Sequence, residues 1–233
     1  MITNTEAPSR LRRLSEESVV IEPPGLPGDL RIPAQAHGLV IFAHGSGSSR
    51  KSPRNTYVAE ALGETGFATL LFDLLTREEE ADRSNVFDIA LLSDRLVSAI
   101  KWANADPRTR GLPIGLFGAS TGAAAALVAS AAAQNHHVGA IVSRGGRPDM
   151  AACAFDWVKA PTLLIVGGDD TQVLRLNREA YDRLHCEKEM MIVPGATHLF
   201  EEPGALDRVV EGVRDWFARH LAAPAGAQQG RSR

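Results

Sequence analysis

The chain has 233 residues, a formal net charge of −3 at pH 7, 44% hydrophobic residues and 23% charged residues. This length suits one α/β domain, and the composition is that of an ordinary globular protein. The small negative charge argues against nucleic acid as the main partner. No apolar run reaches the roughly 18 residues that a membrane-spanning helix needs, so we expect no membrane partner either.

The N-terminal segment, residues 1–18, is polar and basic, without the apolar stretch of a signal peptide. The two cysteines, Cys153 and Cys186, have the spacing of neither a metal site nor a redox motif. We therefore expect a cytoplasmic protein that binds no metal, with residues 1–18 as an extension. Residues 222–233 are rich in Ala, Gly and Gln and are expected to form a disordered tail, which leaves 19–221 as one domain.

Strand and helix patterns alternate along most of the chain. An edge hairpin is expected first, from 19–21 and 29–32, around a turn rich in Pro and Gly. Apolar runs bounded by turn residues then predict buried strands, at 39–43, 67–72, 113–117, 138–142, 162–166 and 189–193. Amphipathic or alanine-rich stretches predict helices between them, at 55–65, 88–104, 123–133, 173–184 and 206–221.

This order predicts an α/β fold with a mostly parallel, doubly wound sheet and helices on both faces. Only 18 residues, 143–160, lie between Val142, the end of one predicted strand, and Pro161, which precedes the next, where a lid could be inserted. We therefore expect no large lid. The acidic run Glu78–Glu80 is expected to form a solvated loop.

The most informative motif is Gly118-Ala119-Ser120-Thr121-Gly122, between a predicted strand and a predicted helix. The two glycines allow a sharp corner, because Cβ atoms there would collide with the neighbouring strand and helix. A serine at this corner projects its hydroxyl outward, beside the backbone N–H groups of a helix N-terminus. We interpret Ser120 as a nucleophile. The alternative is a glycine-rich turn that contains a serine without a catalytic role.

A serine nucleophile needs a base and a third group that orients the base. The strand at 162–166 leads to Asp169 and Asp170, and the last predicted strand leads to His198. The chain order Ser, Asp, His is the one that accompanies this type of corner. We predict a triad of Ser120, Asp170 and His198. Asp170 is preferred because a Gly-x-x-Asp spacing is usual for such an acid, and Asp169 is left to cap the next helix.

The loop after the first long strand, His44-Gly45-Ser46-Gly47-Ser48-Ser49, is rich in Gly and Ser. It can turn a backbone N–H toward the same point as the N–H of Thr121. Ser46 and Thr121 are therefore the predicted oxyanion donors, both through the main chain. A phosphate-binding loop is the rival interpretation, but its Gly-Lys-Ser/Thr ending is missing. His44 is expected to hold the loop rather than to act as a second base.

Four motifs in this order resemble those of the α/β-hydrolase superfamily: His44-Gly45, Gly118-x-Ser120-x-Gly122, Gly167-x-x-Asp170 and His198. The compact, lidless length resembles the dienelactone-hydrolase-like branch of that superfamily, and the resemblance covers about residues 19–221. Dienelactone hydrolases proper use a cysteine nucleophile, whereas this chain has Ser120. That departure favours a serine esterase over a lactone hydrolase.

Several arginines follow predicted strand ends. Arg144 and Arg147 follow the strand at 138–142, and Arg50 and Arg54 follow the Gly/Ser-rich loop. A guanidinium group suits bidentate recognition of a carboxylate. Arg144, Arg147 and Arg50 are therefore the predicted substrate-binding residues, for a small acyl ester or lactone that bears an anionic group. The alternative is that these arginines form surface ion pairs.

These observations lead us to expect a serine hydrolase that cleaves carboxylic esters through an acyl-enzyme intermediate and needs no cofactor. Its expected partner is a small-molecule ester, and a homodimer is compatible with the sequence. Thioesterase, peptidase and perhydrolase activities belong to the same fold and stay as alternatives. A non-catalytic binding protein that retains the pocket is the alternative from a different class.

Overall fold

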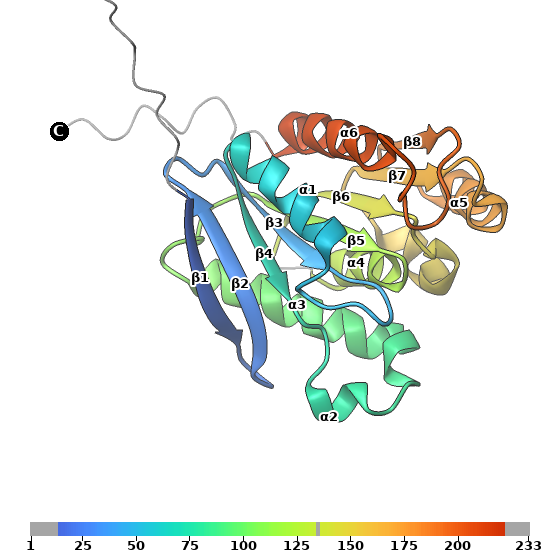
Figure 1. Cartoon of the computed structure of the whole chain (residues 1–233). Helices are drawn as coiled ribbons and strands as arrows, with labels where there is room; N and C mark the ends of the chain where they lie inside the picture. Colours follow the sequence, from blue (N-terminus) through green and yellow to red (C-terminus); the bar gives the residue numbers. More distant parts are fainter. Residues whose placement is uncertain (1–13, 134–135, 222–233) are drawn as a thin grey trace, which may run out of the picture.

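A twisted eight-stranded sheet with helices on both faces forms the described part of the computed structural model, residues 14–133 and 136–221 (Figure 1). The tail expected at 222–233 lies outside the described residues. The strands are β1 Leu14–Ile21, β2 Leu26–Pro33, β3 Gly38–Ala43, β4 Phe67–Phe72, β5 Ile114–Ala119, β6 Val138–Arg144, β7 Thr162–Gly167 and β8 Lys188–Val193. The helices are α1 Pro53–Glu64, α2 Arg77–Glu80, η1 Asn85–Phe87, α3 Ile89–Ala105, α4 Thr121–Ala132, η2 Pro148–Trp157, α5 Thr171–Arg183 and α6 Ala205–His220.

The sheet order is β1-β2-β4-β3-β5-β6-β7-β8. The pairs β1–β2 and β2–β4 are antiparallel, and every later neighbour along the order is parallel. Strands β3 to β7 are buried at every residue. This is why they read as continuous apolar runs rather than as alternating patterns. The predicted fold class, a mostly parallel doubly wound sheet, is confirmed.

The first strand begins earlier than expected. β1 starts at Leu14, inside the segment that the sequence assigned to an extension, and pairs with β2 along its whole length. Residues 15–18 are all exposed on this edge strand. Backbone hydrogen bonds rather than apolar burial hold them in the sheet, so their polar side chains gave no strand pattern to read.

Two hydrophobic cores lie on the two faces of the sheet, and β3 supplies both because its side chains alternate. Val40 and Phe42 pack with α1 and α6 on one face. Leu39 and Ile41 pack with α3 and α4 on the other. In Figure 1 the helices α1 and α6 lie on one side of the sheet, opposite α3 and α4.

The connection between β4 and α3 corrects the sequence interpretation of the acidic run. Arg77–Glu80 form the short helix α2 rather than a loop. Thr76 caps it through a reciprocal pair of hydrogen bonds with Glu79, and Glu79 also pairs with Arg95 of α3. The sequence contained this Thr-x-x-Glu signal, but the short segment has no buried residue and therefore shows no apolar periodicity.

The expected absence of a large lid between β6 and β7 is confirmed. The connection there holds only the short helical stretch η2, which packs against α4 and α5 on the body of the domain. The segment between β4 and α3, which carries α2, extends away from the sheet at the bottom of Figure 1. This segment lines the cavity beside the loop after β3.

Gly122 permits close contact between α4 and the loop after β3. A Cβ atom at this position would lie 2.2 Å from the carbonyl oxygen of Ala43. We expect Gly122→Ala to lower the free energy of unfolding by about 3 kcal/mol or more, because backbone atoms on both sides must move. Urea unfolding followed by circular dichroism measures this change.

The matched control is Gly111→Ala, where the added Cβ meets open space although φ is +84°. That variant should cost only the left-handed backbone conformation, about 1–2 kcal/mol. Equal losses of unfolding free energy in the two variants would show that the close approach to Ala43 does not limit the residue at position 122.

Candidate active site

Ser120 occupies the corner between β5 and α4 in a strained backbone conformation, with φ 52° and ψ −119°. Positive φ is unusual for a residue with a side chain and is found where the surrounding structure enforces it. The Ser120 N–H donates to the Arg144 carbonyl at 3.2 Å, which ties the corner to the end of β6. The hydroxyl does not cap α4. The backbone therefore presents a half-buried hydroxyl at the carboxyl edge of the sheet.

Asp170 and His198 meet across the ends of β7 and β8. The Nδ1 atom of His198 lies 2.7 Å from Oδ2 of Asp170. The Oδ1 atom of Asp170 accepts the Val173 N–H at 3.4 Å and caps α5. Asp170 thus orients the imidazole and also caps α5, so the expectation that Asp169 caps this helix is wrong. The side chain of Asp169 is exposed, and its backbone N–H donates to the Ala196 carbonyl at 3.0 Å.

The imidazole of His198 lies beside the end of β6, the strand whose last residue binds the Ser120 N–H. A Cβ atom on Gly145 would lie 3.5 Å from the His198 Cε1 atom. Gly145 directly follows Arg144, whose carbonyl binds the Ser120 N–H. With Nδ1 bonded to Asp170, Nε2 is the nitrogen left for a reacting group. The described residues show no hydrogen bond between the Ser120 hydroxyl and His198, which is common for catalytic groups in the absence of substrate.

Two contacts fix the loop that carries His198. Thr197 donates to the Glu202 carboxylate from its N–H at 3.1 Å and from its hydroxyl at 2.6 Å. Phe200 has φ 56° and is 2% exposed, so its ring anchors the loop in the core. The imidazole is therefore held by its loop as well as by the carboxylate.

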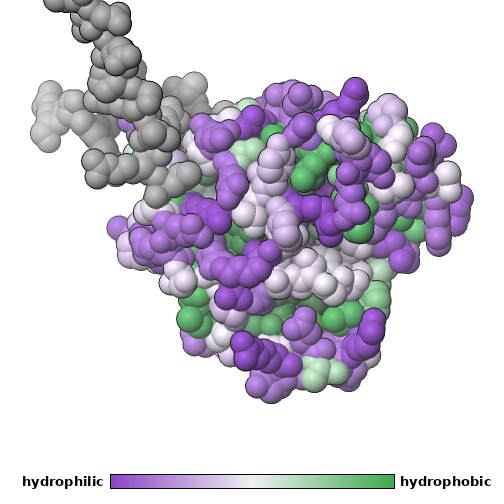
Figure 2. Space-filling model, in the orientation of Figure 1, coloured by the Kyte–Doolittle hydropathy of each residue, from purple (hydrophilic) through white to green (hydrophobic). Residues whose placement is uncertain are grey.

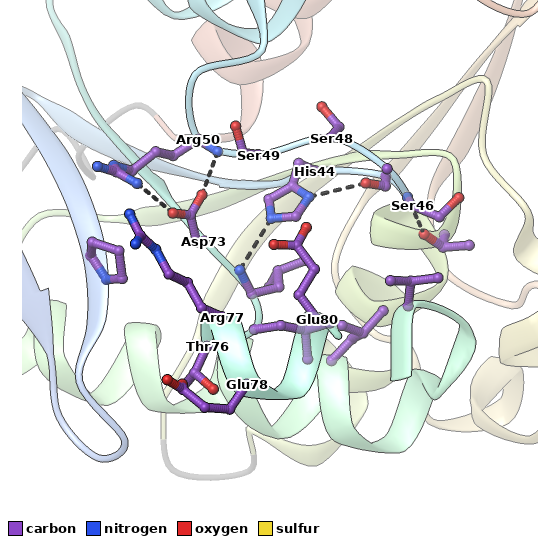
Figure 3. Close-up of a pocket in the computed structure, with 18 of the residues that line it drawn as sticks. His44, Ser46, Ser48, Ser49, Arg50, Asp73, Thr76, Arg77, Glu78 and Glu80 are labelled. Atoms are coloured by element: carbon purple, nitrogen blue, oxygen red, sulfur yellow. Dashed lines mark hydrogen bonds and ion pairs between the residues drawn. The ribbon is translucent and has the colours of Figure 1, made fainter. Parts of the chain in front are cut away.

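The predicted oxyanion loop packs directly against the corner. A Cβ atom on Gly45 would lie 3.0 Å from the Ser120 Cβ atom. The Ser46 N–H donates to Oγ1 of Thr121 at 3.0 Å, the dashed line from Ser46 in Figure 3. Thr121 is the first residue of α4, where the backbone N–H has no acceptor within the helix. The structure brings both predicted donors together, with the Ser46 N–H held by the Thr121 hydroxyl.

His44 holds the loop, as expected. Its Nε2 atom accepts the Leu74 N–H at 3.1 Å, so Nδ1 carries the proton and donates to the Gly45 carbonyl at 3.0 Å. Figure 3 shows these two bonds on either side of the ring. Burial lowers the pKa of His44 below its ordinary value of 6.5. Both nitrogens are used, so the ring joins two loops and has no nitrogen left for a substrate.

The lowered pKa of His44 predicts acid-sensitive stability. Below about pH 6.5 the His44 side chain binds a proton in the unfolded chain, whereas in the folded protein it stays neutral until the pH reaches its lower folded pKa. The stability that neutral, buried His44 contributes is therefore intact above that pH and is lost as pH falls toward the lower folded pKa. We expect the stability of the wild type relative to His44→Gln to fall by up to about 1.4 kcal/mol per pH unit in that window.

Urea unfolding between pH 7.5 and 5 measures the difference. His185→Gln is the control, because the His185 side chain is 70% exposed. A stability difference between wild type and His44→Gln that stays flat with pH would contradict the assignment.

The arginines predicted to bind an anionic substrate are engaged within the protein. Arg50 pairs with Asp73 and with Asp29. Arg147 makes a two-pronged ion pair with Asp149, at 2.9 and 2.7 Å. The prediction that these two guanidinium groups await a substrate anion therefore lacks support, because nearby carboxylates already occupy them.

Arg144 is 6% exposed and donates from Nη2 to the Asn55 side-chain oxygen at 3.0 Å. Its guanidinium lies 5.8 Å from the centre of the Phe200 ring. Burial, together with the nearby charge of Arg54, lowers the pKa of Arg144 to about 10. Arg54 itself pairs with Glu201 at 2.8 Å. Arg144 thus supports the loops around the corner from inside the protein rather than facing a substrate.

A cavity of about 510 Å³ opens beside the Gly/Ser-rich loop. We call it the α2 cavity, because residues of α2 form one wall (Figure 3). Gly45, Ser46 and Thr121 line the end nearest to Ser120. In the space-filling view, a band containing hydrophobic residues separates the lobe that carries α2 from the paler surface above it (Figure 2).

The segment after β4 lines this cavity, and its α2 residues do so although the acidic run was expected to form a solvated loop. Asp73 accepts the Arg50 N–H at 2.7 Å and binds its guanidinium. Arg77 and Glu80 extend from α2 toward the loop that carries His44. The Thr-x-x-Glu capping pattern after a strand end was the one sequence signal for a helix here. It does not indicate which side of that helix faces the site.

Among the described residues, no group of three or more His, Cys, Asp or Glu side chains is placed to hold a metal ion. No helix within residues 14–133 and 136–221 is both long enough and apolar enough to cross a membrane.

Comparison with known proteins identifies the family to which the sequence is similar. The sequence profile of the dienelactone hydrolase family matches residues 26–221. The crystal structure of a dienelactone hydrolase from Anabaena variabilis is 52% identical, with a TM-score of 0.85 over 90% of this chain and 98% of that one. Est1E from Butyrivibrio proteoclasticus shares the fold, with a TM-score of 0.75 and 16% identity over 89% of this chain and 99% of its own.

Two curated Mycobacterium tuberculosis proteins are 56% identical over 212 residues, which make up 91% of this chain and 48% of theirs. They carry a provisional phosphoribosyl transferase name. The chain therefore spans about half the length of these curated relatives.

Proposed function

We propose that this chain, which belongs to the dienelactone hydrolase family, is a serine hydrolase that cleaves carboxylic esters. The observation that carries the proposal is the 2.7 Å contact between His198 and Asp170 on the sheet edge that holds Ser120. The Ser120 backbone is strained, and its hydroxyl makes no capping bond to α4. A carboxylate on Nδ1 fixes the tautomer that leaves Nε2 free to accept a proton. The strained corner presents the hydroxyl on the same sheet edge.

In the proposed first step, the Ser120 oxygen forms a bond to the ester carbonyl carbon while His198 Nε2 takes the hydroxyl proton. The carbonyl electron pair moves onto oxygen, where the Thr121 N–H donates to it. The Ser46 N–H passes from the Thr121 hydroxyl to this oxyanion. One such donor typically contributes about 3 kcal/mol to lowering the barrier. When the tetrahedral intermediate collapses, the bond to the leaving alkoxide breaks and His198 gives it the proton.

The second step releases the acid. A water molecule gives a proton to His198 as its oxygen attacks the acyl carbon. The bond to Ser120 then breaks, and the proton returns to the serine oxygen. Asp170 stabilises the imidazolium in both steps without taking the proton. Together the two steps consume one ester and one water molecule and release an acid and an alcohol.

A fluorophosphonate probe tests this proposal without knowledge of the natural substrate. Such probes phosphonylate a serine only when a base activates it. We expect one adduct by intact mass and its assignment to Ser120 by peptide mapping. Unfolding the protein in urea before exposure to the probe should abolish the adduct. An unmodified Ser120 in the folded protein would refute the serine mechanism and favour a non-catalytic binding protein.

The phosphoribosyl transferase name belongs to proteins about twice as long as the region that this chain matches. The hydrolase family covers residues 26–221, nearly all of the domain described here. We therefore propose the hydrolase activity for this region. Thioesterase, peptidase and perhydrolase reactions would use the same three side chains, and a panel of ester, thioester and amide substrates separates them.

A further inference from the structure

The α2 cavity lies on the oxyanion side of Ser120. Its walls include Gly45, Ser46 and Thr121, and none of the lining residues comes from the loop that carries His198. In the proposed reaction the leaving oxygen must lie within hydrogen-bond reach of His198 to receive a proton. The leaving group therefore faces His198, and the cavity on the other side is the place for the acyl part of the substrate.

The charges of this cavity do not suit an anion. Arg50, the arginine beside the Gly/Ser-rich loop, is already neutralised by Asp73 and Asp29. The charged residues that α2 contributes to the lining are Arg77, Glu78 and Glu80, one positive and two negative. A carboxylate in the acyl group would therefore face a net negative charge from α2.

The same walls are rich in groups that bind hydroxyls. Among the described residues, the exposed side chains of Arg77 and Glu80 form no ion pair or hydrogen bond with another side chain. They extend toward the Gly/Ser-rich loop across the cavity, and Glu80 points toward His44 (Figure 3). A guanidinium group offers only donors and a carboxylate only acceptors. Together they match hydroxyl groups, which both donate and accept. Ser48 and Thr76 are also among the lining residues.

The helix that carries these two residues is held from its other side. Glu79 accepts the Thr76 N–H at 2.9 Å and forms an ion pair with Arg95 of α3. Asn85 donates to the Glu79 carbonyl at 2.7 Å. These contacts fix α2 without using Arg77 or Glu80. The two side chains are thus presented by a supported element, as a recognition surface requires.

We propose that the α2 cavity binds the acyl part of an ester whose acid carries several hydroxyl groups. In this assignment Arg77 donates hydrogen bonds to those hydroxyls and Glu80 accepts from them. Leu74, Leu75 and Val86, which also line the cavity, contact the carbon chain. The inference rests on the proposed ester hydrolase and replaces the anionic substrate that the arginine pattern predicted.

Three methyl esters that share a six-carbon acyl chain test the assignment: methyl gluconate, methyl hexanoate and monomethyl adipate. We expect kcat/KM for the gluconate ester to exceed both others by at least about tenfold, because only its hydroxyl groups offer hydrogen-bond partners to both Arg77 and Glu80. Arg77→Met and Glu80→Gln should each reduce the gluconate-to-hexanoate ratio by about fivefold or more.

The matched control is Arg83→Met, because Arg83 is an exposed arginine of the segment between β4 and α3 that does not line the cavity. Its ratio should equal that of the wild type. A wild-type ratio near one, a preference for the adipate ester, or ratios that neither cavity variant changes would overturn the assignment.

A binding measurement separates this inference from the proposed activity. We expect gluconamide, but not hexanamide, to bind Ser120→Ala by calorimetry, with affinity lost in Ser120→Ala/Arg77→Met. If no ester is cleaved and the fluorophosphonate leaves Ser120 unmodified, the serine mechanism fails, and gluconamide binding would still uphold the cavity assignment. Absence of gluconamide binding would overturn it whatever the activity.

Discussion

Replacing Ser120 with alanine should lower kcat for p-nitrophenyl acetate by at least about 10⁴-fold, because loss of the nucleophile removes the covalent route and leaves only the oxyanion donors and binding. The change should leave the fold intact, because the Ser120 hydroxyl neither caps α4 nor forms a hydrogen bond within the described residues. Initial rates under saturating ester, with circular dichroism as a check on folding, make the measurement.

The matched control is Ser98→Ala, on α3 and away from the corner, where the hydroxyl donates to the Asp94 carbonyl at 3.0 Å. Its kcat should match that of the wild type. Turnover by Ser120→Ala within tenfold of the wild-type rate would remove Ser120 from the mechanism.

The second large effect concerns the two neighbouring carboxylates after β7. Asp170→Asn should lower kcat by about 10⁴-fold, because an amide on Nδ1 stabilises neither the required tautomer nor the imidazolium. Asparagine is as good a helix cap as aspartate, so α5 should keep its N-terminus. Steady-state kinetics together with thermal unfolding separate the catalytic loss from a folding defect.

Asp169→Asn is the control that the chain itself provides. Asp169 is exposed, and only its backbone is tied to the His198 loop. We expect its kcat within about twofold of the wild type. The reverse result, with Asp169→Asn inactive and Asp170→Asn active, would mean that the imidazole turns to the other carboxylate during turnover.

The fold was predictable because its signals are local. Each buried strand is a short apolar run between turn residues, and β4 was predicted with the same bounds that the structure shows. The helix expected to start at residue 88 begins there: Asp88 caps α3, and its side chain accepts the Leu91 N–H at 3.0 Å. The edge strand β1 was placed too late, because exposed polar residues paired only through the backbone carry no hydrophobic pattern.

Local sequence signals suffice for the strand–helix order and for the chemistry available at three strand ends. Glycines at 118 and 122, a serine between them and His198 after the last strand are local facts, and parallel strands necessarily bring their carboxyl ends to one edge. Whether a side chain is free or engaged depends instead on neighbours far away in the chain. Only the tertiary structure paired Arg50 with Asp29 and Asp73, placed Arg144 in the interior, and turned α2 toward the cavity.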